Sequence, residues 1–308
     1  MDDPLDHRSL IAGLTPETRR ALCSQSDGPG LLRIGLHLGM ILLLSAAIFM
    51  SAPGWPVLML IQGILLVFLF TALHETTHRT AFAQRWLNDA VAHVSAFLVI
   101  LGPAHFRYFH MAHHRFTHDP KNDPELASPK PETLWDFAVY LTGLPEWIWR
   151  ATTLVRNALG WNADGFVPQR GLKRIRREAI AFLLGYALLL ITFGADLFWI
   201  WLLPLVLGGP FLRVYLLAEH TFCPHVSNML QNTRTTFTHW VVRWLAWNMP
   251  YHTEHHAYPA VPFHRLPAFH ELARAHLRET QTGYAGFAAN YMTRIRSAGP
   301  LGEVSNAP

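Results

Sequence analysis

The feature that most constrains this fold is a long stretch of chain without charge. Residues Ile34 to Leu73 include no Asp, Glu, Lys or Arg. A helix that crosses the hydrocarbon core of a bilayer needs ~20 apolar residues, so this stretch is long enough for two crossings. It is interrupted at 51–56 by Ser-Ala-Pro-Gly-Trp-Pro, a strong turn signal. We therefore predict a hairpin of two transmembrane helices at about 31–51 and 56–74.

A second apolar hairpin is expected later in the chain. Residues 179–193 and 197–217 are apolar and flank the turn Gly194-Ala195-Asp196. Residues 90–106 are also free of Asp, Glu, Lys and Arg, but they are few and break at Gly102-Pro103, so a short or re-entrant segment is expected there. These patterns favour an all-α, multi-pass membrane protein with about four transmembrane helices in two hairpins.

Composition supports a protein that lies partly in a bilayer and partly in water. Hydrophobic residues make up 51% and charged residues 15%, whereas soluble domains carry roughly 25% charged residues. Such a composition excludes intrinsic disorder and coiled coils. The net charge of +4 comes from basic residues that flank apolar runs, which suits a membrane surface better than nucleic acid. Cys23 and Cys223 are too distant for a CxxC redox site, zinc ribbon or disulfide framework.

The distribution of positive charge predicts an orientation in the membrane. Arg33 and the basic cluster at 170–177 flank the apolar runs, while the turns at 51–56 and 194–196 carry no Lys or Arg. Because cytoplasmic loops are enriched in Lys and Arg, both termini should be cytoplasmic, with the protein in the cell inner membrane. The same orientation brings all the clustered histidines to the cytoplasmic face.

Histidine is the unusual residue of this chain. There are 19 histidines, and most fall in three motifs and their surroundings. The motifs are HxxxH at His74 and His78, HxxHH at His110, His113 and His114, and HxxHH at His252, His255 and His256. Residues three or four apart share one face of a helix, so each motif presents its rings together. Imidazole suits Fe, Zn, Cu and Ni, and eight rings are too many for one ion, so two metals are expected.

The combined motifs resemble the integral membrane fatty acid desaturase and hydroxylase superfamily. The tracts WNMPYHTEHH at 247–256 and PAVPFHRLPAFH at 259–270 are especially similar, and the resemblance covers roughly 34–270. It implies two iron ions bound by about nine histidines without bridging carboxylates. Carried over by position, the implied ligands are His74, His78, His110, His113, His114, His220, His252, His255 and His256.

The apolar runs and the charge pattern also predict an organisation, and the candidate ligands call for supporting residues. We expect one desaturase-like domain over 1–308, with hairpins at about 31–74 and 179–218 and a cytoplasmic helical cap at about 75–178 and 219–308. Leu216 stands where some relatives have an asparagine that acts through a water. The residues expected around the ligands are Asn248, Asp123, Glu219 and His118, and His118 and His225 are alternative ligands.

The implied activity is O2-dependent oxidation of unactivated lipid C–H bonds, with desaturation of a fatty acyl chain as the first expectation. Electrons would come from an external ferredoxin, rubredoxin or cytochrome-type donor. The alternative is a hydroxylase or ketolase of a fatty acid, alkane, carotenoid or other lipid, because the ligands are common to both outcomes. A distant alternative is an intramembrane zinc metalloprotease, since residues 74–78 also read HExxH. A non-catalytic metal transporter or sensor is a further alternative.

Overall fold

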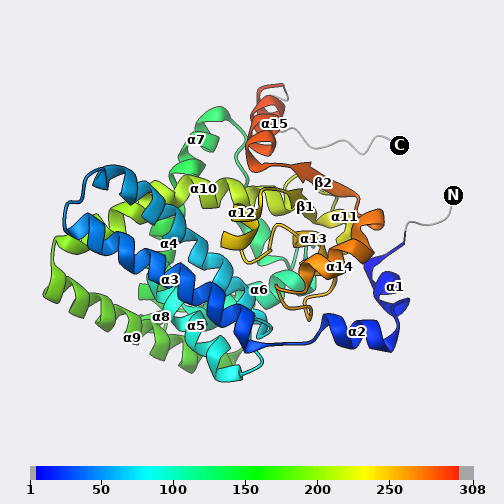
Figure 1. Cartoon of the computed structure of the whole chain (residues 1–308), viewed down its shortest axis with the longest axis horizontal. Coiled ribbons are helices and arrows are strands. Elements are labelled where there is room, and N and C mark those ends of the chain that lie inside the picture. Colours follow the sequence, from blue (N-terminus) through cyan, green and yellow to red (C-terminus); the bar gives the residue numbers. More distant parts are fainter. Residues whose placement is uncertain (1–4, 298–308) are drawn as a thin grey trace.

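The computed structural model describes residues 5–297, and these are mainly α-helical (Figure 1). The long helices are α3 (Asp27–Phe49), α4 (Trp55–His78), α9 (Gln169–Phe193) and α10 (Leu203–His220). The remaining α-helices are α1 (His7–Ala12), α2 (Pro16–Leu22), α5 (Arg85–Leu98), α6 (Pro103–Phe116), α7 (Leu134–Thr142), α8 (Leu144–Leu159), α11 (Met229–Asn232), α12 (Trp240–Leu245), α13 (His252–Ala257), α14 (Leu266–Ala273) and α15 (Tyr284–Ser297). Short 3-10 turns lie at η1 (Pro124–Ala127) and η3 (Arg274–His276), and a π-helical turn lies at η2 (Phe198–Leu202).

The first predicted hairpin is present as α3 and α4. The chain reverses at 50–54, where Gly54 adopts a left-handed conformation with φ of 80°, which glycine reaches without steric cost. Pro56 then lies in the first turn of α4, where its missing N–H has no helical partner to lose. The turn residues read from the sequence therefore form the reversal between the two helices.

Helices α4 and α10 pack with their backbones in close contact. A Cβ atom placed on Gly63 would lie 2.1 Å from the carbonyl oxygen of Pro204, and one on Gly208 would lie 2.2 Å from the carbonyl oxygen of Gly63. Only glycine fits at either position. Small residues serve this purpose between membrane helices generally, because they let two backbones approach. This crossing sets where the ends of α4 and α10 lie, and those ends carry His74, His78 and His220.

Three helical segments are long and apolar enough to cross a membrane. The first is Pro16–Phe49, which comprises α2 and α3. The second is Trp55–His78, which is α4, and the third is Phe198–His220, which comprises η2 and α10. A fourth span is reached if α5 and α6, which meet at 103°, count as one bent pair. The bend falls at the predicted Gly102-Pro103 break. The expected count of about four spans is thus confirmed. However, the first arm of the predicted second hairpin, the apolar half of α9, is not among the described helices that are long and apolar enough to cross a membrane.

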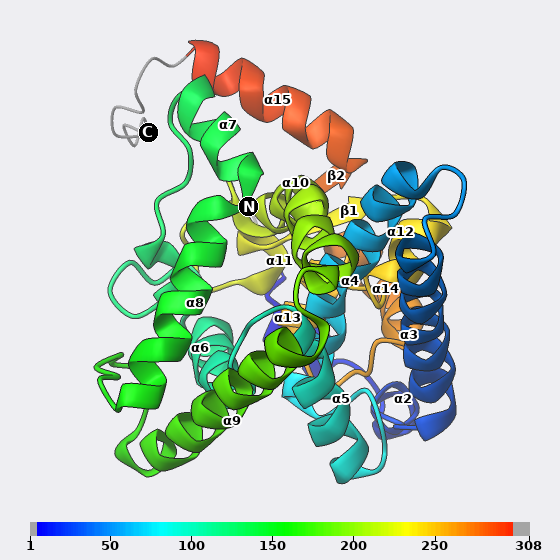
Figure 2. The same cartoon turned by 90° about the vertical axis from the view of Figure 1, so that its left-hand side faces the viewer.

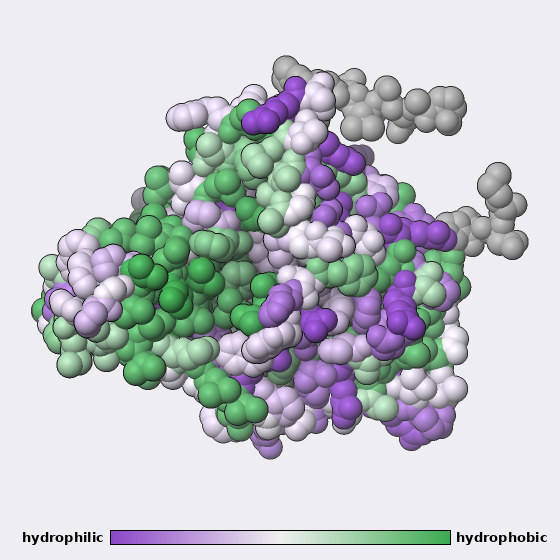
Figure 3. Space-filling view, turned by 45° about the horizontal axis from the view of Figure 1, so that its top comes forward, coloured by the Kyte–Doolittle hydropathy of each residue, from purple (hydrophilic) through white to green (hydrophobic). Residues whose placement is uncertain are grey.

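An exposed apolar surface covers one part of the molecule. Figure 3 shows this hydrophobic region toward the side that holds α3, α4, α9 and α10 in Figure 1, with polar surface toward the opposite side. Large side chains there are strongly exposed, including Leu42 and Leu43 of α3 and Leu188 and Ile191 of α9. A patch of this size on one side is typical of a membrane-embedded surface. The apolar half of α9 shares this surface with the helices long enough to cross.

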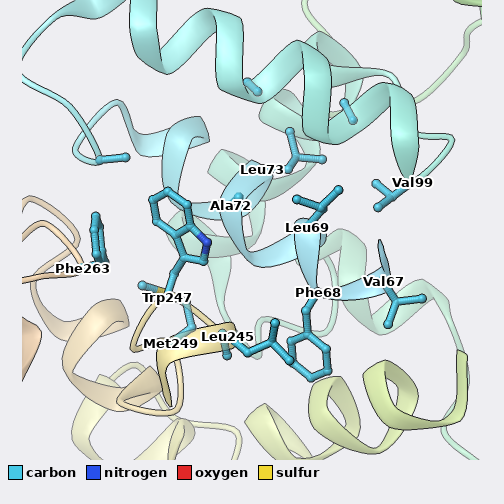
Figure 4. Close-up of a cluster of buried hydrophobic side chains, with 14 of the residues drawn as sticks. Val67, Phe68, Leu69, Ala72, Leu73, Val99, Leu245, Trp247, Met249 and Phe263 are labelled. Atoms are coloured by element: carbon cyan, nitrogen blue, oxygen red, sulfur yellow. The ribbon is translucent and has the colours of Figure 1, made fainter. Parts of the chain in front are cut away.

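The remainder of the chain packs around the C-terminal ends of α4 and α10, which carry the histidines. Strands β1 (Arg234–Phe237) and β2 (Glu279–Thr282) form a small parallel sheet, in which Arg234 pairs with Glu279. This sheet was not expected from the sequence, and it makes the fold mainly rather than wholly α-helical. Figure 4 shows part of the core, in which Trp247 lies between Phe263 and the α4 residues Ala72 and Leu73. Helices α7, α8 and α9 lie on the side of α10 away from α3 (Figure 2).

Candidate metal centre

Four chain segments converge to form the histidine centre. The C-terminal end of α4 carries His74 and His78, α6 carries His110, His113 and His114, α10 ends at His220, and α13 carries His252, His255 and His256. Helical spacing places the rings of each segment on one side. All six residues of α13 are buried, although the segment is short and polar, because it is enclosed by the other helix ends and by the core around Trp247.

The histidines form two groups that could each hold a metal ion. The larger group contains His74, His78, His110, His114 and His255, and the smaller contains His113, His220 and His256; within each group the ligand atoms lie within 4.8 Å of one another. The rings of His114 and His256 stack at 4.0 Å and so join the two groups. His252 is adjacent to the smaller group, with its Nε2 3.1 Å from Nε2 of His220. All nine positions predicted from the sequence therefore meet at one place.

The unpaired ring nitrogens of this centre fit metal ions. Among residues 5–297, both nitrogens of His74 and His255 and the Nε2 atoms of His114 and His256 are buried without a hydrogen-bond partner. Leaving a buried polar atom unpaired costs about 1–3 kcal/mol. The Nε2 atoms of His78 and His110 approach to 2.7 Å, so these two rings point toward the same place. These residues therefore fit two metal ions, and a set of nitrogen donors suits iron among others.

Hydrogen bonds at the opposite ring nitrogen aim several imidazoles into the centre. His113 donates from Nδ1 to Asp123 at 2.9 Å, and His220 contacts the carbonyl oxygen of Asn232 through Nδ1 at 3.3 Å. Such contacts fix the tautomer and leave Nε2 free for a metal. The Nδ1 of His252 lies 3.4 Å from a carboxylate oxygen of Glu219. Asp123 and Glu219 thus lie beside histidines of the centre.

The other predicted supporting residues lie differently. The amide of Asn248 donates to the carbonyl oxygen of Phe263 at 3.0 Å, so it braces the loop before α14. His118 has a left-handed backbone, and its ring lies 5.5 Å from that of His220 and 4.8 Å from that of His225. Neither His118 nor His225 belongs to the two groups found among the described residues. Leu216, which stands in place of an asparagine, lines the adjoining cavity.

Burial keeps the α13 histidines in the form that binds metal. Desolvation, reinforced by neighbouring imidazoles, lowers the pKa of His252, His255 and His256 well below the usual value of 6.5. These rings are therefore neutral near pH 7. Metal binding requires a neutral imidazole, so little proton release opposes it at this pH.

The HExxH reading of residues 74–78 does not fit this geometry. A zinc protease of that kind needs its glutamate beside the metal-bound water as a general base. The Oε1 atom of Glu75 instead accepts hydrogen bonds from Thr80 at 2.8 Å and from the backbone N–H of Phe263 at 3.0 Å. Glu75 therefore ties the end of α4 to the loop before α14.

A cavity of about 150 Å³ opens beside the centre. The histidines at its wall are His74, His105, His110, His113 and His252, and its apolar wall includes Phe70, Leu101, Phe106 and Phe109. Charged side chains from other segments complete the lining: Glu125, Lys130, Glu146, Arg150, Arg213 and Glu219. Of these, only Glu219 was singled out in the sequence, because no motif or spacing marks the others as neighbours of the histidines.

The comparisons with known proteins decide the family. The model of the fatty acid desaturase family matches residues 52–288, most of the chain. The chain belongs to the fatty acid desaturase family. The resemblance seen in the histidine motifs is thereby confirmed, and histidine clusters that could hold metal ions accompany the candidate membrane spans.

Several curated desaturase-family proteins are similar to parts of this chain. An sn-1 oleoyl-lipid 12-desaturase of Picosynechococcus is 30% identical over 40% of this chain and 32% of its own length. A fatty acid conjugase of Calendula officinalis is 23% identical over 70% of this chain and 66% of its own length. A Delta(12) fatty acid desaturase of the same plant is 28% identical over 61% of this chain and 54% of its own length. The chain therefore spans between about a third and two thirds of these relatives.

We expect the loss of the Asp123 carboxylate to weaken metal binding almost as much as the loss of a ligand. Its two carboxylate oxygens accept from His113 Nδ1 and from the backbone N–H groups of His118 and Glu125. Replacing Asp123 by Asn removes the charge that orients His113, and outer contacts of this kind typically cost about 10–100-fold in metal affinity or activity. Competition with a chelator measures the metal affinity. An unchanged affinity would contradict the orienting role. The matched control is Asp119→Asn, because Asp119 is half-buried in the same loop but accepts from Lys121 and Asn122 rather than from a histidine.

Proposed function

We propose that this desaturase-family protein is an O2-dependent di-iron enzyme that desaturates a fatty acyl chain of a lipid. The observation that carries the proposal is the convergence of nine buried or half-buried histidines from four segments beside a partly apolar cavity. Eight of them form two adjoining groups, and His252 lies next to the smaller group. The overall reaction consumes one acyl CH2–CH2 unit, O2, two electrons and two protons, and yields CH=CH and two waters. The names of the curated relatives, which include acyl-lipid desaturases, point to the same substrate class.

In this proposal the chain's own residues bind the irons and position the substrate. The candidate ligands are His74, His78, His110, His114 and His255 for one ion, and His113, His220, His252 and His256 for the other. When bound, the two irons would supply the oxidising equivalents for hydrogen abstraction. Phe70, Phe106 and Phe109 offer an apolar wall that holds an acyl segment next to His74 and excludes water from it.

The electrons come from outside the chain in this proposal. The described cysteines, Cys23 and Cys223, are both free, and no CxxC pair occurs in the sequence. A ferredoxin, rubredoxin or cytochrome-type protein would therefore deliver them. A relative from Nostoc, named as a desaturase that uses ferredoxin, supports the first of these, although it is similar over only 22% of this chain.

We also propose that the centre lies at the cytoplasmic face of the inner membrane, within one domain. The basic cluster at the start of α9, which includes Arg174, lies beside α6, because Glu178 of α9 accepts from the backbone N–H of Ala104 and from Arg174. The start of α6, the helix that also bears three of the clustered histidines, thus lies against the basic start of α9. Cytoplasmic segments are enriched in Lys and Arg, which supports this orientation.

Iron content and lipid analysis together test the proposal. The purified full chain in detergent should contain about two irons. A zinc site would instead be recognised by bound zinc. Mass spectrometry of lipids from expressing cells should show acyl chains that have lost two hydrogens. A gain of one oxygen would identify a hydroxylase, and zinc without iron would contradict the di-iron proposal altogether.

A further inference from the structure

The smaller histidine group has a carboxylate beside it that the histidine motifs do not include. Glu125 lies in η1, in the loop that follows α6, and one of its oxygens, Oε2, is 3.4 Å from Nε2 of His113. Both residues face the cavity. The larger group has five imidazoles, whereas the smaller has three, or four when His252 is included. The smaller group is therefore the one with fewer nitrogen donors.

Three pairwise distances around His113 and His220 are short enough for ligands of one ion, although neither Glu125 nor His252 is part of the group of His113, His220 and His256, whose ligand atoms all lie within 4.8 Å of one another. Two ligand atoms that are each ~2.1 Å from a metal, at angles of about 90–108°, lie ~3.0–3.4 Å apart. The Nε2 atom of His220 is 3.2 Å from that of His113 and 3.1 Å from that of His252. The Glu125 oxygen, at 3.4 Å from His113, falls in the same range. Because Asp123 holds Nδ1 of His113, it is Nε2 that remains for a metal.

Neighbouring contacts hold Glu125 in this position. Its other oxygen, Oε1, accepts from Lys130 at 3.1 Å, and its backbone N–H donates to Asp123 at 2.9 Å. One carboxylate oxygen is thus occupied by an ammonium group and the other is directed at the histidines. Leu216, one helical turn before His220, has no donor atom to offer in its place.

We propose that Glu125 is a carboxylate ligand of the ion held by His113, His220, His252 and His256. The inference rests on the proposed function and deepens it, because it gives the smaller site an oxygen donor and one negative charge. Carboxylates and imidazoles together suit iron. An all-imidazole site would leave the charge of a ferrous ion uncompensated by its ligands, and this carboxylate offsets part of it.

The test is the iron content of Glu125→Gln, which keeps the size of the side chain and removes the charge. Anaerobically reconstituted wild-type chain should hold about two irons and the variant about one, since a site that loses its charged ligand binds more weakly. Mössbauer spectra should show that one iron signal is lost or altered and the other retained. Iron should also raise the thermal midpoint of the variant less than that of the wild type, while the two iron-free proteins melt alike.

Two matched variants separate ligation from other roles of Glu125. Lys130→Met removes the ion-pair partner, and Glu146→Gln removes another carboxylate of the same cavity, one that pairs with Arg150 and Arg213. Both should retain two irons. The proposal is overturned if Glu125→Gln keeps both irons with an unchanged spectrum, or if Lys130→Met loses the same iron. A wild-type chain that binds no iron would overturn the proposed function, and this assignment with it.

Discussion

Alanine in place of His255 is expected to abolish lipid oxidation. His255 lies in the larger histidine group, is fully buried, and has no hydrogen-bond partner among the described residues at either ring nitrogen. Its ring lies 4.7 Å from that of His74 and 4.9 Å from that of His114. Loss of a residue that merely orients a ligand lowers metal affinity or activity by about 10–100-fold. Loss of a ligand should therefore lower activity by at least the upper end of that range. His113→Ala should behave in the same way at the smaller group.

Unsaturated lipid produced by expressing cells, together with iron per purified chain, measures this effect. His7→Ala is the control, because His7 lies in α1 and contacts the backbone of Met229, outside both groups. It should retain activity and iron. If either His255→Ala or His113→Ala retained full activity, the assignment of these residues as ligands would be wrong.

Alanine in place of Gly63 should separate helices α4 and α10 and disrupt the centre at their ends. The added methyl group would lie 2.1 Å from the carbonyl oxygen of Pro204 and 2.8 Å from the backbone nitrogen of Gly208. Both contacts are with backbone, which cannot rotate away as a side chain can. Overpacking typically costs about 1–3 kcal/mol and occasionally more, and a backbone clash of this depth should reach the upper end or beyond. Thermal unfolding in detergent and iron content are the measurements.

Gly39→Ala is the matched control for the packing prediction. Gly39 is also inside a long helix, α3, but a Cβ atom there meets nothing within 4 Å. Because alanine is favoured over glycine in a helix interior by about 1 kcal/mol, this substitution should leave stability unchanged or raise it. Similar melting of the Gly63 and Gly39 variants would contradict the close crossing of α4 and α10.

The sequence alone was sufficient for the first hairpin and for the nine clustered histidines. The run without charge is long enough for two membrane crossings. The turn at 51–56 divides that run where α3 ends and α4 begins. The HxxxH and HxxHH spacings place rings on one face of a helix by local geometry. Both inferences depend only on neighbours in the chain, which is why they could be made before the fold was known.

Other features depended on contacts between distant segments. The parallel pairing of β1 with β2 joins residues more than forty positions apart, and neither short strand carries a strong alternating pattern. The apolar half of α9 is shorter than a full span because charged residues continue into it up to Glu178. Asn248, expected near the metal ligands, instead braces a loop, because its left-handed backbone places its amide against Phe263.

What the sequence by itself determined is the kind of chemistry: many imidazoles in helical register beside membrane-spanning segments. What only the tertiary structure decided is which imidazoles form each group and which other side chains join them. Glu125 reaches His113 because the chain folds back through η1, and His220 meets His252 because α10 and α13 end at the same place. Spacing along a helix fixes directions within a segment, whereas the grouping of ligands depends on how separate segments pack, as at the Gly63–Gly208 crossing.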